Sequence, residues 1–168
     1  MRNKKETLIR LLTGIVIFGL IGVIIISTLY RQNVSAVATL ALYTHENRDR
    51  TYYFVLDDRA NLICTYGTRN HEDIRLNNFM KRFQKNSRTK ISEQEFENIL
   101  LMLDNLDSTK DDYSQEQFFG GLWVGLIYND YVYKAIYWQN DSELFKEIID
   151  EFLRLTPIQV DFSLFFAG

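Results

Sequence analysis

The strongest pattern in the chain is an uninterrupted apolar run near its N-terminus. Residues 11–30 contain no charged side chain, and their isoleucine, valine and leucine residues leave no polar face. A helix of this length spans about 30 Å, the thickness of the hydrocarbon core of a bilayer. A helix in the core of a soluble domain would show one polar face. The pattern therefore predicts a transmembrane helix over residues 11–30, which makes the lipid bilayer its first partner.

The sequence around this run favours an anchor over a cleaved signal peptide. A signal peptide has an apolar stretch of about 7–15 residues with a small-residue cleavage site close behind it. The cleavage-like triplet Ala36-Val37-Ala38 lies well past the run, so we expect an uncleaved signal anchor. Four basic residues fall within the preceding segment, residues 1–10, and positive charge stays on the cytoplasmic side. We expect a single-pass plasma-membrane protein with a cytoplasmic N-terminus and its C-terminal domain outside.

Two hairpins stand out in the remainder of the chain. Residues 51–56 and 62–66 are rich in aromatic and β-branched side chains and flank a polar turn. Residues 122–128 and 131–138 flank Asn129-Asp130, a two-residue loop of the type I′ kind. The sequence therefore predicts an antiparallel sheet.

Helical periodicity alternates with these hairpins. Ser92 and Glu95 form a capping box ahead of a helix that reaches about Leu106, and a further helix covers residues 141–155. A last strand is expected over residues 158–166. An additional helix is predicted from apolar residues at the spacing i, i+3, i+4 and i+7, namely Leu76, Phe79, Met80 and Phe83.

These elements define the expected organisation. Residues 31–50 form a connector, in which residues 34–43 either extend the membrane helix or start a strand. Residues 51–168 form a globular α+β domain, an antiparallel sheet with about three helices on one face. The piece from Thr44 onward is expected to fold on its own, because its elements supply their own apolar partners.

The chain offers little catalytic chemistry. It contains no P-loop, dinucleotide-binding, HExxH or GxSxG pattern, so no catalytic, cofactor or metal-binding residue is predicted. The single cysteine, Cys64, lies in an apolar run and is expected in the core. The alternative is a small membrane-anchored hydrolase or thiol enzyme that uses Cys64, with His71 as its base, or a carboxylate.

Charge supplies the first indication of binding. Residues 32–168 hold fourteen basic and twenty-one acidic residues, which argues against nucleic acid as a partner. Residues 69–90 nevertheless hold seven basic and two acidic residues. Either these charges are simply solvated, or they form a surface for an acidic protein or an anionic surface polymer. The candidate residues are Arg75, Lys81, Arg82 and Lys85.

Aromatic side chains on the second hairpin supply the second indication. Pairing around Asn129-Asp130 puts Tyr128 opposite Tyr131, Leu126 opposite Tyr133, and Leu122 opposite Tyr137, all on one face. Both faces are rich in apolar groups, so the excess either belongs to the core or covers a partner. The candidate residues are Trp123, Tyr128, Tyr131, Tyr133 and Tyr137.

Together these features predict a membrane-anchored, extracytoplasmic binding or interaction module. We expect it to act as an accessory or regulatory subunit of a cell-surface complex rather than as an enzyme.

Overall fold

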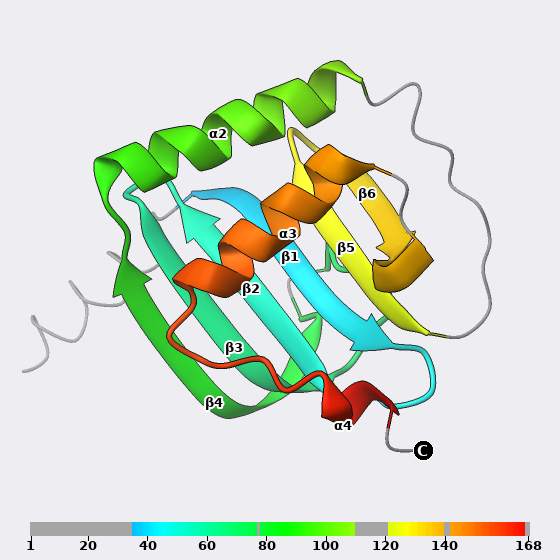
Figure 1. Cartoon of the computed structure of the whole chain (residues 1–168). Coiled ribbons are helices and arrows are strands. Elements are labelled where there is room, and N and C mark those ends of the chain that lie inside the picture. Colours follow the sequence, from blue (N-terminus) through cyan, green and yellow to red (C-terminus); the bar gives the residue numbers. More distant parts are fainter. Residues whose placement is uncertain (1–34, 77, 110–120, 140–141, 167–168) are drawn as a thin grey trace, which may run out of the picture. The chain divides into compact units, whose positions relative to one another are not determined.

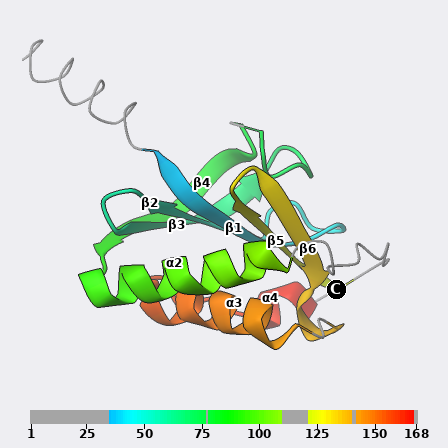
Figure 2. The ribbon, with the colours of Figure 1, turned by 90° about the horizontal axis from the view of Figure 1, so that it is seen from above.

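A six-stranded antiparallel sheet with two long helices on one face forms the domain (Figures 1 and 2). The computed structural model describes residues 35–76, 78–109, 121–139 and 142–166. The strand order is β4-β3-β2-β1-β5-β6, and the α+β class is confirmed. The strands are β1 (Ala36–Thr44), β2 (Thr51–Asp57), β3 (Asn61–Arg69), β4 (Met80–Lys90), β5 (Leu122–Tyr128) and β6 (Tyr131–Ile136).

The expected basic segment and transmembrane helix, residues 1–10 and 11–30, lie outside the described residues. In the ranges that are described, no helix is both long and apolar enough to cross a membrane.

Strand β1 occupies a central position that the sequence left undecided. It pairs with β2 on one side and β5 on the other, and its residues from Ala38 to Thr44 are all buried. A strand covered on both faces reads as a continuous apolar run, which is hard to distinguish from a helix by periodicity. Part of the expected connector over residues 31–50 is therefore the middle of the sheet.

Both predicted hairpins are confirmed. Strands β2 and β3 pair from Thr51 opposite Gly67 to Leu56 opposite Leu62. In the β5–β6 hairpin, Asn129 and Asp130 have φ angles of 46° and 61°. Positive φ at both central positions is the type I′ geometry, which matches the twist of the flanking strands.

The helix predicted from Leu76, Phe79, Met80 and Phe83 is wrong. Met80–Lys90 is strand β4, which pairs along β3, and a loop precedes it. The helical spacing is misleading because its four apolar side chains do not share a face: Leu76 is 42% and Phe83 is 63% exposed. Phe79 instead packs with Ile74 against the sheet face opposite the helices.

Within the described residues, two helices cover the main core, rather than about three. Helix α2 (Glu93–Ser108) begins with the predicted capping box of Ser92 and Glu95. Helix α3 (Glu143–Leu155) buries Phe145, Ile148, Ile149 and Phe152. Beyond α3 there is no strand in the described part of residues 158–166. That segment is irregular and ends in the short helix α4 (Ser163–Phe166).

Candidate functional site

The tyrosines of the second hairpin are divided between the core and one corner of the domain. The predicted pairs Tyr128–Tyr131 and Leu126–Tyr133 are present in the β5–β6 register. Tyr128 and Tyr133 face α2 and are 7% and 0% exposed. Their hydroxyls donate hydrogen bonds to Asp104 Oδ1 at 2.5 Å and Asp107 Oδ1 at 2.9 Å. These two side chains thus attach the hairpin to α2.

The same contacts change the acidity of both phenols. Burial, reinforced by the Asp104 carboxylate, raises the pKa of Tyr128 to about 12. Burial and Asp107 likewise raise the pKa of Tyr133. Both phenols therefore remain protonated hydrogen-bond donors at physiological pH.

The other aromatic candidates lie apart from this pair. Tyr131 is half-buried, and its ring packs against that of Tyr133 at a tilt of 59°. Trp123 is 8% exposed on the opposite face of the sheet, in a cluster that contains Ile136. Tyr137 lies beyond β6, in the short helix η2 (Tyr137–Gln139), so its predicted pairing with Leu122 does not form. The hairpin does not present one continuous tyrosine surface.

An exposed aromatic corner was missed by the sequence reasoning. Trp138 is 60% exposed. Its ring lies edge-on to Tyr137 at a centroid distance of 4.5 Å, and Phe162 from the C-terminal segment is 5.3 Å from Tyr137. Residues 158–166 were predicted to form a strand, which the structure does not have, so this contact was not anticipated.

Three of the four basic candidates lie on one strand. Lys81, Arg82 and Lys85 are all exposed on β4. Arg88 and Lys90 lie further along the same strand and are exposed as well. We call these five side chains the basic edge.

Arg75 and Arg69 do not belong to the basic edge. Arg75 lies in the loop before β4, where its guanidinium holds the Asp73 carboxylate at 2.6 Å. Hydrogen bonds from Arg75 lower the pKa of Asp73 to about 2. Arg69 is buried, and its guanidinium donates to the backbone oxygens of Thr44 at 2.8 Å and His71 at 3.2 Å. Arg69 therefore links the end of β1 to the loop after β3.

Strand β4 lies at the margin of the sheet. It pairs with β3, and among the described residues no strand pairs with its other side (Figure 1). Its sequence MKRFQKNSRTK contains no acidic residue, and most of its side chains are exposed. Two register shifts interrupt its first half, one beside Gly67. A side chain at Gly67 would overlap the carbonyl oxygen of Arg82, so glycine permits this close approach.

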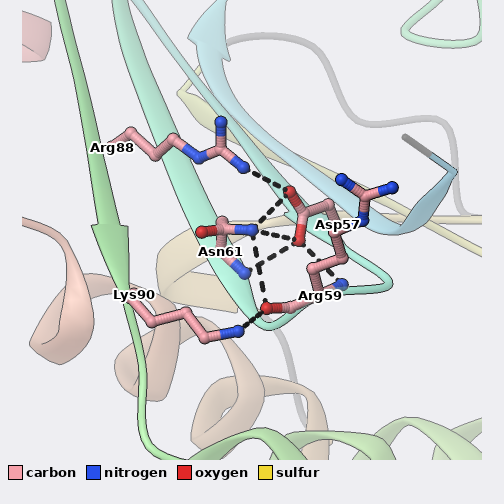
Figure 3. Close-up of polar contacts among 5 residues, drawn as sticks. All are labelled: Asp57, Arg59, Asn61, Arg88 and Lys90. Atoms are coloured by element: carbon pink, nitrogen blue, oxygen red, sulfur yellow. Dashed lines mark hydrogen bonds and ion pairs between the residues drawn. The ribbon is translucent and has the colours of Figure 1, made fainter. Parts of the chain in front are cut away.

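The β2–β3 turn positions the far end of the basic edge (Figure 3). Asp57 is fully buried, and its carboxylate accepts hydrogen bonds from the backbone N–H groups of Arg59 and Asn61 at 2.9 and 2.8 Å. It also accepts one from Arg88 Nη2 at 3.2 Å. Lys90 Nζ donates to the carbonyl oxygen of Arg59. The two cations are therefore held in place, while the side chain of Arg88 remains 52% exposed.

The ionisation of Asp57 follows from the same contacts. Burial alone would raise its pKa, but hydrogen bonds from Asn61 and Arg59 and the charge of Arg88 outweigh burial and lower the pKa. The buried carboxylate stays negative, so it continues to hold Arg88 across β3.

An open groove adjoins the basic edge on the helix side of the sheet. Lys85 and residues 157–162 line the groove, whose volume is about 480 Å³. Asp161 is the acidic residue in this lining, and its carboxylate accepts hydrogen bonds from the backbone N–H and hydroxyl of Ser163. Lys85 is thus the cation that faces the groove.

The residues of the enzyme alternative are not brought together. Cys64 is fully buried in the core beneath the helices, and burial raises the pKa of its thiol to about 11. His71 lies in the loop after β3, with its Nε2 2.9 Å from the Asn70 side chain. Within the described ranges, no group of three or more histidine, cysteine or carboxylate side chains could hold a metal ion.

A scan of protein-family models and a search of curated proteins both found no match to this sequence.

Proposed function

We propose that this chain is a binding module that holds an acidic protein segment on its basic edge. The observation that carries the proposal is the placement of five exposed cations on one marginal strand without an acidic residue among them. Complementary charge speeds association and selects the partner. The buried Asp57 carboxylate adds to this support, because it holds Arg88 in position before any partner arrives.

The proposed setting is the outer face of a plasma membrane. The apolar run over residues 11–30 would anchor the chain, and the basic residues before it favour a cytoplasmic N-terminus. A module held there would serve as an accessory or regulatory subunit of a cell-surface complex. Protease added to intact spheroplasts should then remove the domain, and digestion only after lysis would contradict this orientation.

Lysines on a marginal strand also have a protective role, because they discourage pairing between sheets of identical copies. Protection alone does not require a guanidinium fixed by a buried carboxylate. It also predicts no partner that depends on these charges, so the two explanations differ in a measurable way.

The test is site-specific photo-crosslinking in membranes. A photoreactive residue replaces Gln84, which is exposed on β4, or Gln94, which is exposed on α2 and serves as the matched control. We expect a crosslinked protein from position 84 that is absent from position 94 and weakens at high salt. The neutralised variant Lys81→Gln/Arg82→Gln/Lys85→Gln should lose it.

Two outcomes would contradict the proposal. One is the same set of products from both positions. The other is capture at position 84 that persists undiminished in the neutralised variant, since charge would then play no part.

A further inference from the structure

The backbone of β4 defines how a partner could bind, an inference that rests on the proposed function. Beyond the register shifts, Lys85–Lys90 pair without interruption, from Lys85 opposite Tyr66 to Lys90 opposite Asn61. The next residue, Ile91, donates its N–H to the carbonyl oxygen of Ala60 at 3.0 Å. Ile91 and Ala60 are thus bridged by a single hydrogen bond, since the Ala60 N–H donates to Asp57, and this bond shows that the backbone N–H of Ile91 points to the β3 side.

This pair sets the alternation along the strand. In an antiparallel ladder, every second residue bonds to the neighbour, and the residues between them direct their N–H and C=O groups outward. Counting back from Ile91, Asn86, Arg88 and Lys90 are the outward residues. All three are exposed, so β4 presents backbone donors and acceptors at two-residue spacing.

The same three residues share a side-chain face. Side chains two residues apart lie on one side of a sheet, and the contact of Arg88 with Asp57 places them on the face opposite the helices. A strand laid beside β4 would bring every second side chain next to Arg88 and Lys90. Carboxylates at positions i and i+2 of that strand would complement these two cations.

The charge pattern of β4 also limits which kind of molecule could bind beside the strand. A second copy of β4 would set lysine and arginine against lysine and arginine, which is destabilising for residues directly opposite each other. An anionic polymer without amides could use the cations but not the backbone groups. An extended acidic polypeptide can pair with the cations and also with the outward backbone groups.

We infer that an acidic polypeptide segment, with carboxylates at alternate positions, adds to the sheet as a seventh strand beside Lys85–Lys90. Strand addition is a common mode of peptide recognition, in which backbone hydrogen bonds supply affinity and alternate side chains supply specificity.

The first arm of the test uses peptides and the unaltered full chain in detergent, with binding followed by fluorescence anisotropy. The probe is a short peptide in which glutamate and valine alternate. Its control has the same composition with the glutamates contiguous. Two further peptides carry N-methyl groups on one or the other alternating set of amides. We expect the alternating peptide to bind more tightly than its control, and one N-methylated set, but not both, to lose binding.

The second arm alters the strand. Asn86→Pro removes an outward N–H, at a kind of position where proline is tolerated in sheets, and Asn86→Ala keeps that N–H as the matched control. We expect Asn86→Pro to weaken peptide binding by about tenfold and Asn86→Ala to leave it nearly unchanged. Thermal unfolding of both variants reports whether the fold survives. If the proline variant does not fold, the N-methylated peptides decide.

The outcomes separate the two proposals. Salt-dependent binding that ignores both N-methylation and Asn86→Pro would overturn strand addition and leave the charge-based function standing. Equal binding of the alternating and contiguous peptides would overturn the predicted spacing. If no acidic peptide binds and position 84 captures no acidic protein, both proposals fail and the cations only protect the sheet margin.

Discussion

A fragment that starts at Thr44 lacks nearly all of β1, and we expect it not to fold. Strand β1 lies between β2 and β5. Without it the sheet separates into β4-β3-β2 and the β5–β6 hairpin, and two formerly paired strand margins are exposed. The sequence-based prediction was that the piece from Thr44 onward folds by itself, and unfolding of the two fragments decides between these predictions.

The size of the effect follows from the buried side chains of β1. Leu40, Leu42 and Tyr43 are at most 1% exposed. Burial of a large apolar side chain contributes about 1.5–3 kcal/mol, so these three account for about 5–9 kcal/mol. That is comparable with the whole free energy of unfolding of a typical domain, about 5–15 kcal/mol. A fragment that starts at Ser35 retains these residues and should fold.

The assay is urea and thermal unfolding of both fragments, followed by circular dichroism. The fragment from Ser35 should show one cooperative transition, and the fragment from Thr44 should show none. Within the longer fragment, Leu40→Ala should cost about 2–5 kcal/mol. The matched control, Leu101→Ala at a residue 61% exposed on α2, should change stability by less than about 0.5 kcal/mol. A cooperative transition in the fragment from Thr44 would refute the assignment of β1 to the core.

Three further predictions follow from other buried groups. Phe152→Ala should cost about 3–5 kcal/mol in urea unfolding, because Phe152 is fully buried against Phe54. Because folding lowers the pKa of Asp57 below its usual 3.8, its carboxylate stabilises the fold above about pH 4, and this contribution is lost as the pH falls toward the folded-state pKa. The stability difference between the unaltered protein and Asp57→Asn should therefore shrink between about pH 6 and about pH 3, and a constant difference would contradict the linkage. Cys64, with its pKa raised to about 11, should resist iodoacetamide at about pH 8 in mass-spectrometric assays until the protein is unfolded, whereas rapid labelling of the folded protein would show an accessible thiolate.

Part of the candidate site was visible in the sequence. The excess of lysine and arginine over residues 69–90 drew attention to Lys81, Arg82 and Lys85, which do share one exposed strand. The same count included Arg69, which is buried, and Arg75, which is held by Asp73. Composition records how many charges a segment carries but not which of them reach solvent, because exposure depends on segments remote in the chain.

Local chemistry was sufficient wherever an element is specified by its own residues. The Asn129-Asp130 turn adopts positive φ angles and so specifies the β5–β6 hairpin and its register. The capping box of Ser92 and Glu95 marks the start of α2. These features depend on atoms within a few residues of each other, so the sequence by itself determined them.

Only the tertiary structure decided the roles of β1 and β4. The apolar run of β1 suits a helix or a buried strand, and pairing with both β2 and β5 selects the strand. The apolar spacing that runs from Leu76 into β4 is typical of a helix, yet the ladder to β3 stabilises an extended chain. Those hydrogen bonds join residues far apart in sequence, so no short window contains them. The place of the basic edge at the margin of the sheet, and the outward direction of its backbone groups, depend on the same long-range pairing.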